Sequence, residues 1–416
     1  MSSLDAQLAA ALASRDDRHI RRRLPAPTDP TAPPYADYAS NDYLALARSP
    51  TLRTHLLARL AAAPAILGSG GSRLLVNGAP HAALEARLAA FFRAPAALLF
   101  NSGFDANAGF FACVPQRGDA VVHDEHIHAS VHDGVRAGRA AHLSFAHNDV
   151  AALRGVLRRL LAEHRGLREG RGSVFIAVET VYSMDGTIAP LREIVALAEE
   201  LLPRGNAHVV VDEAHATGIY GPQGRGVVAM LGLEDKVLAR LHTFGKALAA
   251  SGAVVLTSVL VRDYLLNYAR PLIYTTSLSH ANIIAAGCSF DMLENGTAEK
   301  LSKHLLDLCA YFLHLLRAEL ATIDPSILSL PPHLQSPLST DPATSPTSLP
   351  TPIIPLLTRL PRPLSAFLLA RGINARPITW PTVPKGKDRV RICLNAGATR
   401  ADVLALARAV VEWARA

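Results

Sequence analysis

A chain of 416 residues, half of them hydrophobic and 19% charged, can bury a large core, which excludes a globally disordered protein. Its 42 basic and 35 acidic residues leave a net charge of +7, but the basic residues are dispersed, so we expect no nucleic-acid partner. The longest weakly polar run, 247–261, is too short and too rich in Ser and Gly to span a bilayer, and four scattered cysteines without a C-x-x-C pair fit a reducing compartment.

Neither the cellular compartment nor the meaning of the positive charge is decided by the sequence. We expect a cytoplasmic protein, with the peroxisome and the mitochondrion as alternatives, because acidic residues accompany the N-terminal Arg21-Arg22-Arg23 and mitochondrial presequences avoid them. The net charge indicates either an ordinary solvated surface or a preference for a polyanionic small molecule such as a nucleotide-bearing thioester.

Helical patterns open the chain. Residues 3–23 have the pattern of a helix, which the Pro-rich stretch 25–34 must end. The Ala-, Leu- and Arg-rich segments 56–63 and 82–92 are also helical in pattern.

Short apolar runs then alternate with helical stretches. The expected strands are 96–100, 120–122, 174–178, 208–211 and 253–258, and the expected helices between them include 149–164 and 191–202. This alternation predicts an α/β fold with a mostly parallel sheet covered on both faces. The ligand of such a sheet binds beyond the carboxyl ends of the strands.

The pattern changes past about residue 295. A long helix, 298–320, leads into a Pro/Ser/Thr-rich tract, 331–352, that we expect to loop out without packing a core. Strand-like segments at 353–357 and 389–394 and helix-like segments at 364–370 and 400–415 follow. We therefore divide the chain into an N-terminal helix and arm (1–50), a large α/β domain (51–295) and a small C-terminal α+β domain (296–416).

One lysine stands in a setting that favours chemistry. Lys246 follows Thr243-Phe244-Gly245, and its neighbours on both sides are apolar or small, so we expect its side chain to be buried or half-buried. Burial disfavours the ammonium form and makes the amine nucleophilic, able to form a Schiff base with a cofactor aldehyde. An isolated lysine of this kind is more often a plain surface residue.

An apolar strand delivers a carboxylate and a histidine upstream of this lysine. Asp212 ends the run Val209-Val210-Val211, where it could hold a pyridinium nitrogen protonated, and His215 could hydrogen-bond a phenolic ring oxygen. Asp212 could instead cap a helix or bind a metal. We expect no metal, because no further His/Asp cluster at ligand spacing supports one.

A series of motifs resembles the α-oxoamine synthases, a family of fold-type I pyridoxal 5'-phosphate (PLP) enzymes. The motifs in chain order are Ser40–Leu44, Gly68–Leu74, Asn101–Asn107, His128-Ala129-Ser130, Ser183-Met184-Asp185-Gly186, Asp212–Gly218, Thr243–Lys246, Tyr274–Ser277 and Thr382–Gly386. Each motif alone is weak, but nine in the family's order and spacing are specific. The resemblance implies a large, mostly parallel PLP-binding domain with a small C-terminal α+β domain.

The resemblance also implies a role for each matching residue. Catalytic roles fall to Lys246, Asp212, His128 and His215; cofactor binding to Ser102, Gly103, Phe104, His128, Ser183, Asp212, His215, Thr243, Lys246, Thr275 and Thr276; and substrate binding to Arg21, Asn41, Ser72, Thr382 and Arg391. In the family, the two threonines reach the cofactor phosphate of the neighbouring subunit, which implies a homodimer with its active site at the interface. Without the resemblance, Ser102-Gly103 could be a plain turn and His128 an ordinary loop histidine.

Two arginines compete for the carboxylate of the amino acid. Arg389 and Arg391 share one face of a strand by alternation, so spacing cannot separate them. The resemblance favours Arg391, whose guanidinium fork matches a carboxylate.

The family joins an amino acid to an acyl-CoA with loss of CoA and carbon dioxide. Arg21-Arg22-Arg23-Leu24-Pro25 and Pro381-Thr382-Val383-Pro384 are most similar to the biotin-pathway branch, which uses L-alanine and pimeloyl-CoA or a carrier-protein thioester. The arginine triplet could also be an exposed helix end that interacts with the helix dipole.

Other members of the family, and other classes, stay open. A glycine C-acetyltransferase, a secondary-metabolite aminoketone synthase, an aminotransferase of the same fold and a scaffolding subunit without activity are the alternatives. Three departures leave the substrates open: Ala45 where the family has glycine, Ala396-Gly397-Ala398-Thr399 without the usual histidine, and the insertion at 331–352. The retained Lys246 argues against the scaffolding subunit.

Overall fold

The computed structural model describes residues 2–18, 20–24, 35–75, 78–339, 341 and 345–416. The Pro-rich stretch 25–34 thus lies outside the described residues. Within those ranges, no helix is long and apolar enough to cross a membrane.

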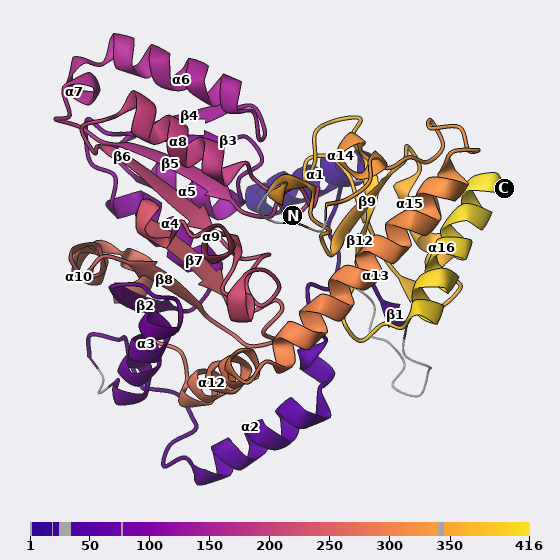
Figure 1. Cartoon of the computed structure of the whole chain (residues 1–416), viewed down its shortest axis with the longest axis horizontal. Helices are drawn as coiled ribbons and strands as arrows, with labels where there is room; N and C mark the ends of the chain where they lie inside the picture. Colours follow the sequence, from indigo (N-terminus) through magenta and orange to yellow (C-terminus); the bar gives the residue numbers. More distant parts are fainter. Residues whose placement is uncertain (1, 19, 25–34, 76–77, 340, 342–344) are drawn as a thin grey trace.

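A seven-stranded sheet forms the larger lobe (Figure 1). Its order is β2-β8-β7-β6-β5-β3-β4, and its strands are β2 Ala96–Phe100, β3 Ala120–Asp124, β4 Ala141–Phe145, β5 Val174–Glu179, β6 Ala207–Asp212, β7 Ala239–Thr243 and β8 Ala253–Thr257. Only β8 runs opposite to the other six strands. The mostly parallel α/β sheet predicted from the sequence is therefore confirmed.

Helices cover both faces of this sheet because its strands are apolar on both sides. In β2, Leu98 and Phe100 pack into one cluster, while Ala97 and Leu99 pack into the other. The first cluster includes side chains of α4 Gly103–Cys113, α5 Ala129–Ala137, α10 Val259–Tyr268 and α11 Arg270–Ile273. The second includes side chains of α3 Ala79–Phe91, α6 Val150–Glu163, α7 Arg165–Arg168, α8 Leu191–Leu201, α9 Val227–Leu231 and α12 His280–Glu294. Each fully buried Leu or Phe contributes about 1.5–3 kcal/mol.

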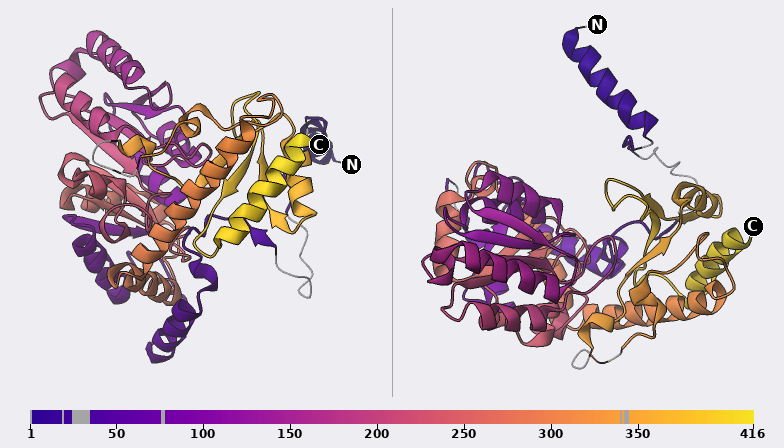
Figure 2. Two further views of the ribbon diagram at one scale, coloured as in Figure 1. Left: turned by 45° about the vertical axis from the view of Figure 1, so that its right-hand side comes forward. Right: turned by 90° about the horizontal axis from the view of Figure 1, so that it is seen from above.

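The C-terminal lobe is built around the long helix α13 Thr297–Leu320 (Figure 2). It contains the antiparallel sheet β11-β12-β9 and the short pair β1-β10, with β1 Ala36–Asp37, β9 Ile353–Leu357, β10 Ile373–Asn374, β11 Arg376–Ile378 and β12 Arg389–Cys393, and the helices α15 Pro361–Leu369 and α16 Arg400–Arg415. The pairing of β1 with β10 brings the N-terminal arm onto this lobe. Short 3₁₀ helices lie at Leu46–Arg48, Pro222–Gly224, Glu234–Lys236 and Pro346–Ser348.

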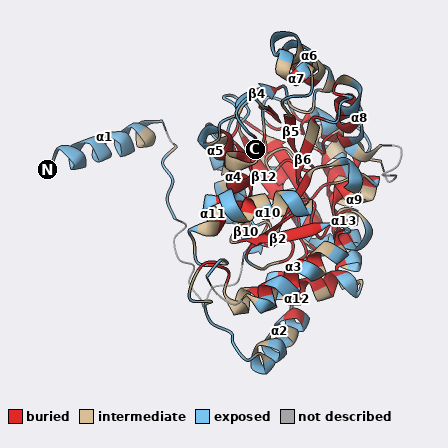
Figure 3. Ribbon diagram, turned by 90° about the vertical axis from the view of Figure 1, so that its left-hand side faces the viewer, coloured by how far each residue is buried: buried red, intermediate tan, exposed pale blue. Residues whose placement is uncertain are grey.

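Two helix ends differ from the sequence expectation. The first helix, α1 Ser3–Asp17, is shorter than the expected 3–23, and Arg21 and Arg23 beyond its end both pair with Asp16. No residue of α1 is buried (Figure 3). The next helix, α2 Pro50–Ala62, begins before the expected residue 56, because Ser49 caps it and a proline occupies its first position.

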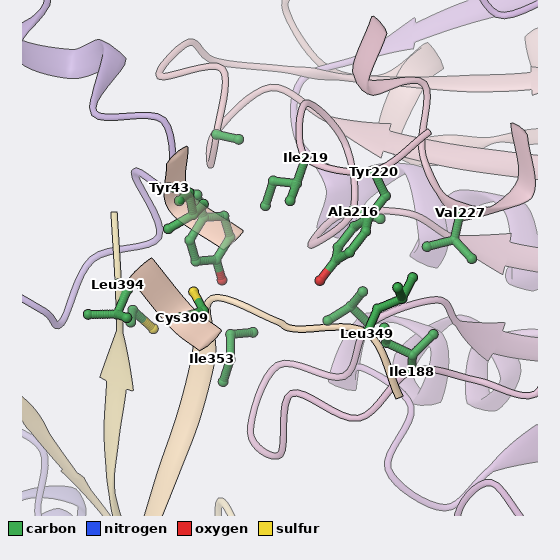
Figure 4. Packing of buried hydrophobic residues seen from close by; sticks show 14 of the residues in the cluster. Tyr43, Ile188, Ala216, Ile219, Tyr220, Val227, Cys309, Leu349, Ile353 and Leu394 are labelled. Carbon is green, nitrogen blue, oxygen red and sulfur yellow. The ribbon is translucent and has the colours of Figure 1, made fainter. Parts of the chain in front are cut away.

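The Pro/Ser/Thr-rich tract 331–352 was expected not to pack a core, and this expectation is wrong for part of it. The tract forms the short helix α14 Pro332–Gln335, in which Leu334 is only 1% exposed. Leu349 packs in the cluster that includes Tyr220, whose hydroxyl donates to the Pro350 carbonyl at 2.7 Å (Figure 4). Single leucines between prolines are enough to anchor the described part of the tract.

Candidate active site

A cavity of about 730 Å³ lies at the carboxyl ends of β3, β5 and β6, where the C-terminal lobe covers the sheet. It is lined by seven of the residues that the sequence predicted for the site: Asn41, His128, Ser183, His215, Lys246, Thr382 and Arg391. They come from segments far apart in the chain, so the fold brings together residues that only motif position had connected.

Lys246 enters the cavity from the loop that follows β7. Phe244 is fully buried and its N–H donates to the Gly252 carbonyl at 2.9 Å, which fixes the start of the loop. Lys246 itself is half-buried, in agreement with its apolar surroundings in the sequence. Burial lowers the pKa of this amine, and the nearby carboxylate of Asp212 opposes the shift without cancelling it. The amine is therefore closer to its nucleophilic neutral form than an exposed lysine is.

Asp212 ends β6 and is held by two donors. Its Oδ2 accepts from Asn107 Nδ2 at 2.7 Å and its Oδ1 accepts from the Ala214 N–H at 2.8 Å. Asn107 also donates to Ser130 Oγ at 3.1 Å, and Ser130 Oγ lies 2.7 Å from Nδ1 of His128. One chain of hydrogen bonds thus connects the buried carboxylate to the exposed ring of His128.

His215 belongs to a second chain of hydrogen-bonded polar groups. Its Nδ1 lies 2.7 Å from the hydroxyl of Tyr43, which donates to Oδ1 of Asn41 at 3.2 Å. The same Asn41 oxygen accepts from Arg391 Nη2 at 2.6 Å. Burial, together with the charges of Lys246 and Arg391, lowers the pKa of His215 well below its usual value. The imidazole is therefore neutral at physiological pH.

The structure separates the two arginines that strand alternation could not. Arg389 pairs with the carboxylate of Asp185 and donates to the Met184 carbonyl at 3.0 Å. Arg391 donates to the Ser183 carbonyl at 3.0 Å and to Asn41, and it forms no ion pair with any described carboxylate. Arg391 lines the cavity and Arg389 does not.

The residues predicted to hold a phosphate gather at the N-terminus of α4. Ser102 caps this helix, and its Oγ accepts from the Asp105 N–H at 3.0 Å and donates to Asp105 Oδ2 at 2.8 Å. Gly103 packs against Thr243, because a Cβ built on the glycine would lie 3.4 Å from the Thr243 Cβ. The ring of the next residue, Phe104, stands edge-on to His128 at 6.2 Å between centroids.

Thr275 and Thr276 lie against the same α4 loop within one chain. Asn101 Nδ2 donates to the Thr276 carbonyl at 2.7 Å and approaches Thr275 Oγ1 at 3.4 Å. Neither threonine lines the cavity.

Two predicted substrate residues are not brought to the cavity. Arg21 pairs with Asp16 at 2.6 Å, and its neighbour Arg22 lines the cavity instead. The two residues adjoin in a segment without helix or strand, so pattern alone could not decide which one faces inward. Ser72 is 9% exposed and lies outside the cavity, where its Oγ accepts from the Leu74 N–H at 3.4 Å.

Some residues of the site were not assigned a role from the sequence. Asn107, Ser130 and Tyr43 lie inside the recognised motifs, so their positions were visible although their hydrogen bonds were not. Glu179 ends β5 and is 3% exposed. Its only signal was a carboxylate at the end of an apolar strand, the same pattern that singled out Asp212.

The chain is similar to known proteins along nearly its whole length. The family model for aminotransferase class I and II matches residues 34–410. An 8-amino-7-oxononanoate synthase of Emericella nidulans is 44% identical over 410 residues, 98% of this chain and 95% of the relative. The aminoacyl transferase sphA of Aspergillus fumigatus is 38% identical over 387 residues, 91% of this chain and 80% of the relative. A solved structure of SPT with PLP as an internal aldimine has a TM-score of 0.78 at 25% identity and covers 100% of this chain and 99% of that one.

Proposed function

Because this chain belongs to the aminotransferase class I and II family and is a PLP-dependent acyltransferase, we propose that it acts as an α-oxoamine synthase. Such an enzyme condenses an acyl-CoA with an amino acid and releases CoA and carbon dioxide. The specific reaction that we propose is the condensation of pimeloyl-CoA with L-alanine to 8-amino-7-oxononanoate in biotin biosynthesis. The observation that carries the proposal is the half-buried amine of Lys246, which faces the same cavity as Arg391.

The residues in the cavity and next to it fit PLP. An aldehyde would meet the Lys246 amine, whose lowered pKa favours the nucleophilic form. A ring nitrogen would meet Asp212, a buried carboxylate that forms no ion pair with a described cation and is oriented by Asn107. A phosphate would meet the N-terminus of α4, where Ser102, Gly103 and Thr243 gather. Bound there, PLP supplies an electron sink for charge that develops on the α-carbon of the amino acid.

The side chains of the protein then divide the remaining work. Arg391 binds the amino-acid carboxylate, since its guanidinium is positioned by Asn41 and Ser183 but not neutralised. Lys246 moves a proton at Nζ, for which a low pKa suits it. His128 presents its ring to the cavity from the cap of α5, where Ser130 fixes its orientation.

The cavity rim supports an acyl group that ends in a carboxylate. Arg22 and Lys385 line the cavity together with Trp380, so two cationic groups and an aromatic ring are available to a substrate. A dicarboxylic acyl chain would place its far carboxylate among such cations, whereas an acetyl group would not use them. The relative from Emericella nidulans bears the name of an enzyme of this specificity.

A secondary-metabolite aminoketone synthase is the second candidate function. The observation that favours it is the similarity to the aminoacyl transferase sphA.

An activity assay separates the two candidates. The purified enzyme is given pimeloyl-CoA or a long-chain acyl-CoA, each with alanine, glycine or serine, and the release of CoA is measured. We expect the highest kcat/KM for pimeloyl-CoA with alanine. Turnover of the long-chain thioester alone would favour the second candidate, and amino-group exchange without CoA release would refute a synthase.

We also propose that the enzyme is a homodimer. The support for a homodimer is a set of apolar side chains that are exposed in the single chain, on segments next to the loop that contains Thr275 and Thr276. The exposed fractions of Leu67, Leu75 and Tyr274 are 78%, 83% and 72%. A second copy would cover such a surface and could bring Ser72, Thr275 and Thr276 to a neighbouring cavity.

A further inference from the structure

Two carboxyl groups end adjacent strands in register beside the site. Glu179 is the last residue of β5 and Asp212 the last residue of β6, and the two are paired Cα partners in the parallel ladder. Partners in register lie about 4.8 Å apart and point to the same face of the sheet. Both are buried, with exposed fractions of 3% and 7%. Two buried carboxyl groups at paired positions on one face of a sheet are costly to ionise together, which favours a single proton on the pair.

Hydrogen bonds decide which one is ionised. Asp212 accepts from the Asn107 amide and from the Ala214 N–H, one donor for each of its oxygens. For Glu179, by contrast, Oε1 has no hydrogen-bond partner among the described groups. Hydrogen-bond donors stabilise an ionised carboxylate. Asp212 has more donors than Glu179, so the proton of the pair is favoured on Glu179.

The surrounding charges agree with this division. Asp212 on β6 and Asp124 on β3 raise the pKa of Glu179 in addition to the effect of burial. Lys246 opposes them, but burial lowers the pKa of that amine as well. Of the remaining titratable neighbours, His128 has its pKa lowered by burial and Tyr182 has its pKa raised, so neither adds a positive charge at neutral pH.

We infer that Glu179 is a positioning residue that holds the single proton of the Glu179–Asp212 pair and thereby keeps Asp212 ionised. The pair then carries one negative charge, located on the oxygen atoms that Asn107 orients. Lys246 faces one anion instead of two, which leaves its amine easier to deprotonate. This role rests on the proposed function, but the location of the proton does not.

Infrared spectroscopy of the holoenzyme tests where the proton lies. A protonated carboxyl shows a C=O stretching band that a carboxylate lacks, so we compare the wild type, Glu179→Gln and the matched control Glu85→Gln at pH 9. Glu85 is also buried, but it forms an ion pair with Arg73 at 2.9 Å and has no second carboxyl group beside it in the sheet. A third buried glutamate, Glu213, has a pKa raised to about 7 by burial and is ionised at this pH.

The expected result is that Glu179→Gln removes the band and Glu85→Gln leaves it intact. An unchanged band in Glu179→Gln, or no band in the wild type, would overturn the inference. If Glu179→Gln does not fold, Asp212→Asn gives the answer: without the neighbouring charge, the Glu179 band should titrate away at lower pH than in the wild type. A band that titrates as in the wild type would overturn the pairing of the two groups.

Turnover provides a second readout. The amide of glutamine mimics a protonated carboxyl, so Glu179→Gln should retain kcat within about threefold and keep the shape of the pH profile. A loss above about 100-fold with a shifted profile would mean that an ionised Glu179 is required, which would overturn the inference. If no acyl-CoA is turned over by the wild type, the proposed function fails while the infrared result still stands.

Discussion

The guanidinium of Arg391 is oriented by neutral oxygens and lacks a described counter-ion, which is the arrangement that carboxylate binding requires. Its Nη2 and Nη1 donate to Asn41 Oδ1 and to the Ser183 carbonyl. Arg389, two residues earlier on the same face, is neutralised by Asp185. Alternation along the strand predicts that the two arginines share a face. It could not predict which one is neutralised, because Asp185 belongs to a segment that only the folded chain brings near.

Replacing Arg391 by lysine should therefore weaken amino-acid binding. Lysine keeps the charge but loses the two-pronged donor, so we expect KM for alanine to rise about 10- to 100-fold, with a smaller change in kcat. Steady-state kinetics at saturating acyl-CoA measure both constants. The matched control is Arg389→Lys, which should lower the melting temperature and leave KM for alanine unchanged. If Arg389→Lys raises KM for alanine and Arg391→Lys only lowers the melting temperature, Arg389 is the carboxylate ligand.

At the scale of elements, the strands that pattern missed were those with polar residues. The edge strand β4 is mostly exposed, and β7 contains the buried Arg240 and His242, so neither is a plain apolar run. Buried polar residues on a central strand depend on tertiary partners: Arg240 donates to the Phe92 carbonyl at 3.0 Å, and the His242 ring contacts the Phe92 ring in a tilted arrangement, with 4.1 Å between centroids. The remaining strands of the sheet were predicted because both of their faces are apolar.

Three helices of the larger lobe are joined at one carboxylate. Asp291 of α12 accepts from Arg87 of α3 and from His55 of α2, each at 2.7 Å. Burial alone would raise the pKa of Asp291, but these two hydrogen bonds and the charges of Arg87 and Arg59 outweigh it, so the pKa lies below its usual value. A carboxyl group with a depressed pKa stabilises the fold above its unfolded-state pKa, and this contribution is lost as the pH falls through the folded-state value.

Asp291→Asn should therefore lower the free energy of unfolding by about 1 kcal/mol at pH 7, a figure already reduced for partial exposure. The difference from the wild type should stay nearly constant from pH 7 down to about pH 4, where the unfolded-state pKa lies, and it should shrink only below that pH, as the folded wild type also takes up the proton. Urea unfolding at several pH values on both sides of pH 4 measures both effects. A penalty that stays constant below pH 4 as well would mean that the substitution disturbs packing and that the ion pairs contribute nothing.

At the scale of the whole molecule, the fold brings together the four residues expected to be catalytic, but it does not bring two of the residues expected to bind substrate to the cavity. Lys246, Asp212, His128 and His215 lie in contiguous motifs and meet around one cavity or its hydrogen-bond chains. Arg21 and Ser72 lie in irregular segments whose side-chain directions no periodicity determines. In the proposed homodimer, the second subunit would complete the surroundings of Ser72, which the single chain does not show.

The loop before Ser72 is ordered but apolar, which makes it the place to test that dimer. The carbonyls of Ile66 and Leu67 accept from the N–H groups of Ala281 and His280, at 3.1 and 3.0 Å, so the backbone is anchored while the Leu67 side chain stays 78% exposed. A rigid, exposed leucine loses little entropy when a partner covers it, and it contributes fully to association.

Leu67→Glu should weaken the dimer by about 2 kcal/mol, which raises its dissociation constant about 30-fold. Leu260→Glu is the matched control, because Leu260 is 79% exposed on α10, a helix that packs on the opposite face of the sheet from α12. Analytical ultracentrifugation over a dilution series, with CoA release measured on the same samples, should show activity falling together with the dimer in Leu67→Glu alone. A monomer that keeps full turnover per chain would refute a site shared between subunits, since the cavity of one chain would then be sufficient for catalysis.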